Sequence, residues 1–532
     1  MNRNNPFLLS ALSGILLSLP WLIPGFGGLM FFAFVPLLLA EEPRIDPKHP
    51  RSLSFLFLLD FIAFLIWNLA TSWWICYVSF AGMLLIAALN SLIMASVWWA
   101  RAFVQRRLGT VSGYFALLVF WTAFEFLHQN WSLRWPWLTL GNGLANSVKI
   151  IQWYEYTGVL GGSFWILLSN ILIFRVVGSF FKKSYRSSLK FGVYALLIIL
   201  LPVTGSLLRY SSFREKGESC EVVVLQPNID PYTEKFSGMS PDRQVRKLIE
   251  LADSTVTSSA DFVLAPETAL PECWEDSIKN GGLHLEPLTG FLRKYPKLSF
   301  VAGAITKRKL GKREALSQTA RFSADKSYSY DVYNSALLTD STSKVQICHK
   351  SILVSGVEKM PFQEYFSFLR KYLIDLGGAN GSFAAAGEPE VFQVNGRVKI
   401  GPVICFESVF GAQAATLARK GASVLFVLTN DGWWRESPGA RQHFSYSRIR
   451  AIETRRSIAR SANTGISGFI NQRGDVLRQT KMNTNTAIRA KLNLNNKLTF
   501  YVRNGDYVGR ISLIFSVLIV IYLVVFGWRT KS

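Results

Sequence analysis

Three residues with reactive side chains each stand at the end of an apolar, strand-like run. Glu267 follows DFVLAP, Lys350 follows KVQICH, and Cys405 follows IGPVI. Open α/β sheets build their sites at such strand ends. A cysteine nucleophile needs a base that takes its proton or a cation that holds its thiolate, and the oxyanion that develops needs a positive donor. A glutamate, a lysine and a cysteine can supply these roles.

Each of the three also has an ordinary structural interpretation. Cys405 could be a small buried apolar residue. Glu267 could cap a helix together with Thr268, and Lys350 could be a solvated loop charge. Spacing alone does not bring the three together, so both interpretations stay open here.

Other kinds of site lack their motifs. The five cysteines and five histidines are dispersed, with no CxxC pair and no Cys/His ligand spacing, so we expect no metal site. The sequence has no GxxxxGKS/T phosphate loop, no GxGxxG after a strand and no GxSxG elbow. We therefore expect no cofactor. A disulfide among Cys220, Cys273 and Cys348 is allowed but not required by their spacing.

The distribution of apolar residues indicates an integral membrane protein. Half of the 532 residues are hydrophobic, 17% are charged, and the mean hydropathy is +0.23. Roughly 20 apolar residues cross a bilayer. We predict eight spans, the second of them interrupted by Pro36: residues 7–23, 29–40, 53–69, 81–100, 114–127, 159–174, 191–208 and 511–528. No A-x-A site follows the first span, so a cleaved signal peptide is not expected.

Basic residues gather in alternate loops between these spans. One side carries Arg3, Arg44, Lys48, Arg51, Arg101, Arg106, Arg107, Arg175, Lys182, Lys183, Arg186, Lys190, Arg529 and Lys531. The other side carries Arg134 and Lys149 before the large segment. The positive-inside rule then places both termini in the cytoplasm. The sequence predicts a seven-span bundle over residues 1–208, an extracytoplasmic domain over 209–510, and a last span with a cytoplasmic tail over 511–532.

The large segment reads as an α/β domain. Apolar strands are predicted at residues 221–225, 261–264, 299–303, 398–404 and 423–428, with helices between them. One helix is marked by Ser240 as N-cap and Pro241 at its first position. Near-continuous apolar strands that alternate with helices predict a sheet covered by helices.

Ordered motifs of this domain resemble the nitrilase, or carbon-nitrogen hydrolase, superfamily. They are APE ending at Glu267, HK ending at Lys350, the later Glu358, and CFE from Cys405 to Glu407. Members of that superfamily use a Glu-Lys-Cys triad in an α-β-β-α sandwich. With its many spans, the whole chain is similar to the bacterial apolipoprotein N-acyltransferases. Further matches are Gln226-Pro-Asn-Ile-Asp230, Lys235-Phe236, Asn430 to Trp434, Arg450 to Arg455, and Asn463-Thr-Gly465.

The resemblance implies a role for each matched residue. Cys405 becomes the acylated nucleophile, Glu267 the general base, and Lys350 the stabiliser of the thiolate and the oxyanion. Glu358 and Glu407 match additional acids that support the lysine and the cysteine. The chain departs from the family pattern at three places: Phe406 replaces a usual Tyr, Phe236 replaces a usual Trp, and VSGVE at residues 354–358 replaces a Val-Pro-Phe-Gly-Glu loop.

The reaction implied by this resemblance is a ping-pong acyl transfer. A phospholipid donates an acyl chain to Cys405 as a thioester, and the amine of a diacylglyceryl-cysteine apolipoprotein receives it, which is the last step of lipoprotein maturation. The expected setting is the bacterial inner membrane, with the α/β domain in the periplasm. A single chain holds every role, so a monomer is expected.

Two other functions compete with this one. A membrane-tethered nitrilase-type amidase would use water as acceptor, and a non-catalytic lipid-binding protein would tolerate loss of Cys405. The net charge of +23 also suits nucleic acid as a partner. A domain outside the cytoplasm argues against nucleic acid.

Several aromatic residues are candidates for lipid contact. Residues 361–376 show an aromatic pattern compatible with an amphipathic helix near the bilayer, including Phe362 and Phe366. Phe236, Trp433 and Trp434 are further candidates, and packing within the domain is the alternative for each. Within the predicted spans, Asp60 and Glu125 are expected to face the bundle interior. Snorkelling or a position at a helix end is the alternative for Glu125.

Overall fold

The computed structural model describes residues 5–45, 53–236, 238–283, 285–311, 314–359, 383–394 and 396–529. It divides into two compact units, Met1–Phe213 with Asn504–Ser532, and Arg214–Arg503. The predicted amphipathic helix at residues 361–376, with Phe362 and Phe366, lies outside the described residues and stays a prediction.

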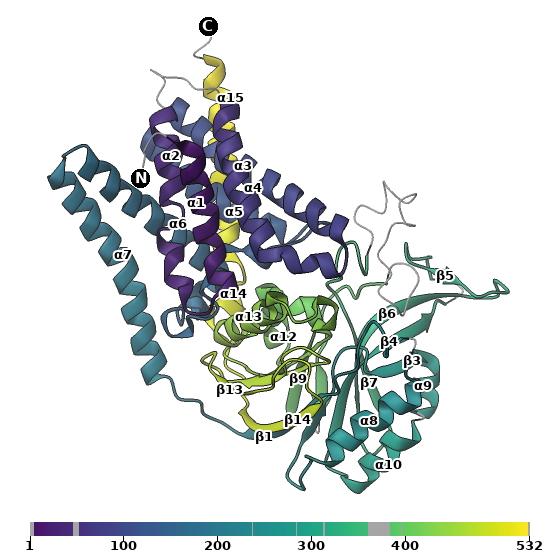
Figure 1. The fold of residues 1–532 in the computed structure, drawn as a ribbon. Coiled ribbons are helices and arrows are strands. Elements are labelled where there is room, and N and C mark those ends of the chain that lie inside the picture. The colour runs from purple at the N-terminus through teal and green to yellow at the C-terminus, as the bar shows by residue number, and fades with distance from the viewer. Residues whose placement is uncertain are drawn as a thin grey trace. The chain divides into compact units, whose positions relative to one another are not determined.

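The first unit is a bundle of helices (Figure 1). Its longer helices are α1 (Pro6–Leu22), α2 (Val35–Ile45), α3 (Leu53–Ser72), α4 (Phe80–Leu108), α5 (Thr110–His128), α6 (Tyr154–Phe181), α7 (Tyr185–Ser212) and α15 (Tyr507–Arg529). Short 3-10 turns join them: η1 (Phe26–Phe31), η2 (Trp73–Tyr77), η3 (Pro136–Leu138), η4 (Leu140–Leu144) and η5 (Val148–Ile150). Among the described residues, six helices are long and apolar enough to cross a membrane: Leu53–Tyr77, α4, α5, α6, α7 and Tyr507–Val525. The helix α1 is apolar but shorter.

The span predicted at residues 29–40 is not a single helix. The chain there forms η1 and then α2, which has 11 residues. At 1.5 Å per residue, α2 is about 16 Å long, roughly half the thickness of the hydrocarbon core. Pro36 is the second residue of α2, where its missing N–H costs no hydrogen bond. The number of spans therefore stays a prediction.

Several basic residues assigned to loops lie in helices instead, namely Arg44, Arg101, Arg106, Arg107, Arg175, Arg186 and Lys190. Arg101 departs furthest from the expectation, because it lies inside the bundle. Arg101 belongs to α4, is fully buried, and forms an ion pair with Glu41 of α2. Trp98 Nε1 donates a second hydrogen bond to Glu41, at 2.9 Å. The expectation of a loop was wrong because α4 continues to Leu108 and Glu41 supplies the counter-charge. Asp60 and Glu125 are buried, as expected.

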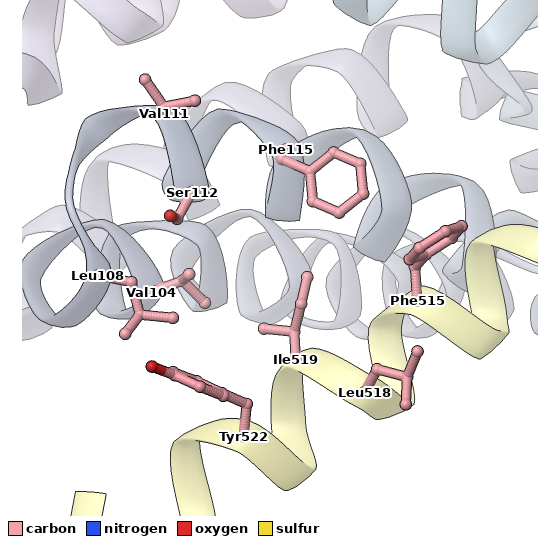
Figure 2. A pocket seen from close by; sticks show the side chains of 9 residues that line it. All are labelled: Val104, Leu108, Val111, Ser112, Phe115, Phe515, Leu518, Ile519 and Tyr522. Carbon is pink, nitrogen blue, oxygen red and sulfur yellow. The ribbon is translucent and has the colours of Figure 1, made fainter. Parts of the chain in front are cut away.

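A groove runs between α15 and the corner where α4 meets α5 (Figure 2). Gly109 joins α4 to α5 with a φ of 88°, a conformation that glycine adopts without steric cost. Phe115 of α5 and Phe515 of α15 form an edge-on ring contact at 5.6 Å. The groove has a volume of about 400 Å³ and mostly apolar walls. Such walls suit a surface that faces lipid chains.

The second unit contains two mixed sheets and their covering helices. The strands are β1 (Ser219–Gln226), β2 (Phe262–Leu264), β3 (Leu270–Trp274), β4 (Ser299–Lys309), β5 (Arg321–Phe322), β6 (Ser329–Thr339), β7 (Val345–His349), β8 (Phe392–Val394), β9 (Val398–Ile404), β10 (Val424–Thr429), β11 (Ser457–Ala462), β12 (Gly468–Ile470), β13 (Val476–Gln479) and β14 (Thr486–Asn493). The helices are α8 (Pro241–Asp253), α9 (Glu275–Gly281), α10 (Glu286–Lys294), η7 (Cys405–Val409), α12 (Gly411–Arg419), η8 (Asp431–Trp434), α13 (Pro438–Thr454) and α14 (Phe500–Asn504).

The first sheet has the order β14-β1-β2-β4-β6-β5, with β3 paired to β4 and β7 paired to β6. The second sheet has the order β13-β12-β11-β10-β9-β8. In the second sheet β9, β10 and β11 are parallel, so their carboxyl ends meet at one edge. In the first sheet β1, β2 and β4 are likewise parallel.

The two sheets pack face to face and helices cover their outer faces. Phe262 of β2 meets Phe426 of β10 in the core between the sheets, with ring centroids 5.5 Å apart. Figure 1 shows α8, α9 and α10 beside the first sheet and α12 and α13 beside the second. Within β10, Phe426 faces the inner core and Leu425 the outer one, which explains why the strand shows no alternation. The predicted α-β-β-α sandwich is confirmed.

The predicted helix signal at Ser240 is also confirmed. The Ser240 side chain accepts a hydrogen bond from the Arg243 backbone N–H, and α8 begins at Pro241. Val245 and Leu248 lie on the face of α8 that packs against the first sheet. Local sequence and packing therefore agree in this helix.

Candidate active site

Glu267, Lys350 and Cys405 follow three different strands. Glu267 comes after β2, Lys350 comes directly after β7, and Cys405 opens η7 at the end of β9. The first two residues belong to the first sheet and the third to the second sheet. The two sheets must therefore be packed together before these residues can form one site.

The structure argues against the ordinary structural interpretations of Glu267 and Lys350 and leaves that of Cys405 open. The chain continues from Glu267 through Thr268 into β3, so Glu267 caps no helix in this described stretch. Lys350 is only 1% exposed, so it is not a solvated loop charge. Cys405 packs partly against the core between the sheets, as a small apolar residue would, but charged groups also act on its thiol.

Lys350 lies between two carboxylates. Its Nζ is 3.2 Å from Glu267 Oε1 and 2.8 Å from Glu358 Oε1. Asn334 Nδ2 donates to the same two oxygens, at 2.8 and 2.9 Å. All four side chains are buried. We call Lys350, Glu267, Glu358 and Asn334 the lysine cluster.

Asn334 is the member of the lysine cluster that the sequence did not reveal. It lies within β6, and its backbone carbonyl accepts a hydrogen bond from Lys350 N–H at 2.8 Å. The strand reads SYDVYNSALLT, in which one amide among polar and apolar residues gives no motif. The useful signal was a polar residue in a strand that is buried along most of its length.

The two glutamates of the cluster differ in their free hydrogen-bonding capacity. Glu358 uses Oε1 for Lys350 and Asn334, and its Oε2 accepts from the Val354 N–H at 2.8 Å. Glu267 uses Oε1 for the same two donors, whereas no hydrogen bond to its Oε2 is found among the described residues. A Cβ at position 303 would lie 2.6 Å from Glu267 Cα, so Gly303 permits this close packing. Glu267 is the better placed of the two to accept a proton.

Electrostatics connect the lysine cluster to the thiol. Burial lowers the pKa of the Lys350 ammonium, but the charges of Glu358 and Glu267 outweigh burial and hold it above its ordinary value. Burial raises the pKa of the Cys405 thiol, the charge of Glu267 adds to this effect, and the charge of Lys350 opposes it. The thiol is therefore protonated at neutral pH, and nucleophilic attack requires a base.

Glu407 joins the lysine side of the site to the cysteine side. Its Oε1 accepts hydrogen bonds from the Ser351 N–H and Oγ, the Ile352 N–H and the Gln413 Nε2. Its Oε2 accepts from the Ile404 N–H at 2.8 Å. Ser351 follows Lys350 and Ile404 precedes Cys405, so one carboxylate fixes both segments. Burial raises the pKa of Glu407 despite these hydrogen bonds.

Lys235 is a second buried cation beside Glu267. Its Nζ donates to the Glu267 backbone carbonyl at 3.1 Å. Burial lowers the pKa of Lys235 to about 8, and the charge of Glu267 opposes this shift. The ammonium thus has a backbone acceptor but no carboxylate within ion-pair distance among the described residues.

The aromatic candidates differ in exposure: Phe406 is buried, whereas Phe236 and Trp434 reach the surface at least in part. Phe406 is buried and contacts Phe410 edge-on at 5.1 Å. Phe236 is 40% exposed and stacks on Trp433 at 5.9 Å. Trp434 is half-buried and packs against His443 at 5.4 Å. Phe236 is thus the most accessible of the aromatic candidates inside the described ranges.

The other cysteines show no catalytic environment. Cys76, Cys220, Cys273 and Cys348 are free thiols. Burial raises the pKa of Cys220 and of Cys273 to about 12. In the part of the chain that the structure describes, no group of three His, Cys, Asp or Glu side chains is arranged to hold a metal ion.

Two protein-family models match the chain in sequence. Residues 13–172 match the apolipoprotein N-acyltransferase N-terminal domain, and residues 222–496 match the carbon-nitrogen hydrolase domain. The second match covers the two sheets and the site described above.

Curated relatives match nearly the full chain. The apolipoprotein N-acyltransferase of Chlorobaculum tepidum is 30% identical, over 96% of this chain and 95% of its own length. The apolipoprotein N-acyltransferase of Geobacter metallireducens is 28% identical, over 94% of this chain and 92% of its own length. Among solved structures, a variant of the Nesterenkonia AN1 amidase from the nitrilase superfamily matches 56% of this chain and 97% of its own, with 14% identity and a TM-score of 0.37.

The sequence relatives extend over both units, including the apolar helices. The resemblance drawn from the ordered motifs is therefore confirmed, and with it an enzymatic N-acyltransferase that is associated with a membrane and has a lipoprotein as acceptor. The chain belongs to the apolipoprotein N-acyltransferase family, and its second unit carries the carbon-nitrogen hydrolase domain.

Proposed function

We propose that this N-acyltransferase works through a Glu267-Lys350-Cys405 triad, with a phospholipid as acyl donor and a Cys405 thioester as intermediate. The observation that carries the proposal is the electrostatic link between the lysine cluster and the thiol. Lys350 touches Glu267, and the charges of both residues act on Cys405. A base and a fixed cation beside a thiol are what thioester chemistry requires.

In the first half-reaction, Glu267 takes the thiol proton and the Cys405 sulfur attacks the ester carbonyl carbon of the phospholipid. The new S–C bond forms as the carbonyl oxygen becomes an oxyanion, which Lys350 stabilises by its positive charge. The oxyanion collapses, the C–O bond to the glycerol breaks, and the proton on Glu267 passes to the leaving alkoxide. The products are the thioester and a lysophospholipid.

In the second half-reaction, the α-amine of the diacylglyceryl-cysteine apolipoprotein attacks the thioester. Glu267 removes a proton from the amine, the S–C bond breaks, and the proton returns to the Cys405 sulfur. The amide product leaves and the enzyme is restored. Water would discharge the thioester in the same way, so burial of the lysine cluster favours transfer over hydrolysis.

Glu358 and Glu407 support these steps. Glu358 is saturated by Lys350, Asn334 and the Val354 N–H, which suits a residue that orients the lysine. Glu407 fixes the segments next to Lys350 and Cys405. Phe406 follows the nucleophile in the chain and packs against Phe410. Phe236, Trp433 and Trp434 are proposed lipid contacts, together with Phe362 and Phe366.

The proposed setting is the bacterial inner membrane. Residues 1–208 would form the bundle, 209–510 the periplasmic domain, and 511–532 the last span and cytoplasmic tail, as the loop charges favour. We propose that the enzyme acts as a monomer, because one chain holds every catalytic role. The proposed reaction uses no cofactor, metal or nucleic acid.

The test is to incubate purified full-length protein with phospholipid vesicles and to look for a hydroxylamine-sensitive acyl group on Cys405 by mass spectrometry. A diacylated lipopeptide is then added, and amide formation is followed. We expect acylation in the first step and transfer in the second. Absence of acyl-Cys405 would reject the triad, and an acyl-enzyme discharged only by water would favour an amidase-like hydrolase.

A further inference from the structure

A second polar cluster contacts Cys405 through its backbone. His443 of α13 lies with Nδ1 2.9 Å from Asp431 Oδ1 and with Nε2 2.8 Å from Ser408 Oγ. Ser408 Oγ donates to the Cys405 carbonyl at 2.8 Å, and His443 Nε2 is 3.1 Å from the same oxygen. We call Asp431, His443 and Ser408 the histidine cluster.

The contacts of the histidine cluster follow the order of a serine-hydrolase triad: carboxylate, imidazole, hydroxyl. Burial excludes that chemistry. Asp431 and His443 are 0% exposed and Ser408 is 1% exposed, so no substrate carbonyl can reach the hydroxyl. The cluster therefore acts on the groups it already contacts, among them the backbone of Cys405.

The carboxylate end of the cluster is ionised and anchored. Arg460 Nη2 donates to Asp431 Oδ2 at 2.9 Å, and Thr429 Oγ1 donates to Oδ1 at 2.8 Å. Burial raises the pKa of Asp431, but the charge of Arg460 and the hydrogen bonds from His443 and Thr429 outweigh burial and lower it to about 2. An ionised carboxylate only accepts hydrogen bonds, so His443 Nδ1 carries the proton that points to Asp431. Burial and the charge of Arg460, whose Nη2 lies 3.0 Å from Nδ1, lower the pKa of His443, so the ring is neutral and its Nε2 is an acceptor. The single hydroxyl proton of Ser408 is therefore shared between His443 Nε2 and the Cys405 carbonyl.

The backbone at Cys405 needs such an anchor. Its φ is 51°, in the left-handed region that costs a non-glycine residue roughly 1–2 kcal/mol. Glycine would relieve the strain but could not supply the thiol. Strained residues persist where surrounding contacts over-determine them. Here the hydroxyl of Ser408 holds the Cys405 carbonyl, and His443 lies against both.

We propose that the histidine cluster is a positioning device that holds the Cys405 carbonyl and thereby sets the direction of the thiol toward the lysine cluster. The proposal rests on the proposed function in one respect, namely that Cys405 is the nucleophile. Ser408 and His443 are positioning residues, since they act through the backbone of Cys405. A misplacement of about 1 Å at a reacting atom can cost on the order of 100-fold in rate.

The experiment compares Ser408→Ala with Ser445→Ala in full-length protein. Ser445 of α13 is buried, as Ser408 is. Its Oγ donates to the carbonyl of Gln442 at 2.7 Å, three residues earlier in the chain, which matches the spacing from Ser408 to Cys405. His443→Leu removes the polar ring, and His443→Gln keeps a polar side chain. For each protein we measure the rate of Cys405 alkylation by iodoacetamide, the rate of acylation from phospholipid vesicles, and thermal unfolding.

We expect Ser408→Ala and His443→Leu each to slow the alkylation of Cys405 by about 10-fold and its acylation by about 100-fold. His443→Gln should recover part of the loss, and Ser445→Ala should change neither rate. Lower stability with unchanged rates per folded molecule would overturn the proposal, because it would show a purely structural role. Labelling of Ser408 by a fluorophosphonate in the wild-type protein would also overturn it.

The alkylation rate separates this proposal from the proposed function. If wild-type Cys405 is alkylated but never acylated by phospholipid, the proposed function fails. The order of alkylation rates among the variants then still decides whether the histidine cluster positions the thiol.

Discussion

The lysine cluster and the histidine cluster both act on Cys405, and they differ in exposure and in how they act on this residue. Glu267 and Glu358 are 7% and 8% exposed, whereas Asp431 and His443 are 0% exposed. The charges of Glu267 and Lys350 act on the thiol, with a smaller contribution from Asp431, whereas Ser408 and His443 contact the backbone carbonyl. The lysine cluster thus mainly supplies charge to the reaction, and the histidine cluster mainly positions the nucleophile. Substitutions in the site should therefore reduce activity and stability by different amounts.

The largest effect is expected for Lys350→Met. Acylation of Cys405 should fall by at least about 10³-fold, because the oxyanion loses its cation. The free energy of unfolding should fall by about 3–5 kcal/mol, because Glu267 and Glu358 are left buried without a counter-charge. Single-turnover acylation and chemical denaturation measure the two losses.

The matched control is Lys294→Met. Lys294 forms an exposed ion pair with Asp253 at 3.3 Å, and its removal should cost less than about 1 kcal/mol. Near-normal acylation in Lys350→Met would remove the lysine cluster from the chemistry and erase the contrast between the two clusters.

A smaller loss is expected for Glu407→Gln. The amide NH₂ would face one of the N–H donors that now bind the carboxylate, so stability should fall by about 1–3 kcal/mol. Acylation should slow by roughly 10- to 100-fold as Cys405 shifts relative to Lys350. Glu388→Gln, at the exposed ion pair with Lys420, is the control and should match wild type. Equal behaviour of both variants would mean that Glu407 does not join the two halves of the site.

The pH dependence of stability tests the burial of Lys235. Its pKa is about 8 in the folded chain and about 10.4 when unfolded. Between these values the unfolded state binds more protons, so this group makes stability rise with pH across that window. Lys235→Met lacks this contribution, so its stability relative to wild type should be highest near pH 7 and decline toward pH 10.

Unfolding midpoints of wild type and variant in one detergent, at pH 7, 8.5 and 10, measure this decline. The exposed Lys297→Met variant should show a constant difference from wild type. A constant difference for Lys235→Met as well would show that the Lys235 ammonium is not desolvated.

The smallest effect is expected for Phe236→Trp. The larger ring can keep the stack on Trp433, so activity should stay within about 3-fold of wild type. Phe236→Ala, which removes the stack, should lose about 10-fold, measured as amide formation from vesicle-bound phospholipid. Equal activity of both variants would exclude a role of this ring in lipid contact.

The sequence predicted the elements whose signals are local. The cap at Ser240 and the apolar run of β10 depend on neighbouring residues, and both were found as predicted. Arg101 was misplaced because the counter-charge that buries it, Glu41, lies about sixty positions earlier in the chain. A single sequence does not show such a pair.

The same limit applies to the site. Glu267, Lys350 and Cys405 stand at strand ends, where polar residues interrupt apolar runs. His443 and Asn334 lie inside elements that are buried on nearly every side, so neither periodicity nor a motif separates them from other polar residues. Their roles depend on contacts between elements, and those contacts exist only in the folded chain.

The division of the site between two sheets also sets the order in which it can become reactive during synthesis. A ribosome that has reached Lys350 has produced the strands that carry the base and the cation, but not β9 or the nucleophile. The thiol is made last and meets its partners only when the second sheet docks, an event that Glu407 completes by binding both segments. A nascent chain therefore cannot acylate itself before its domain is built.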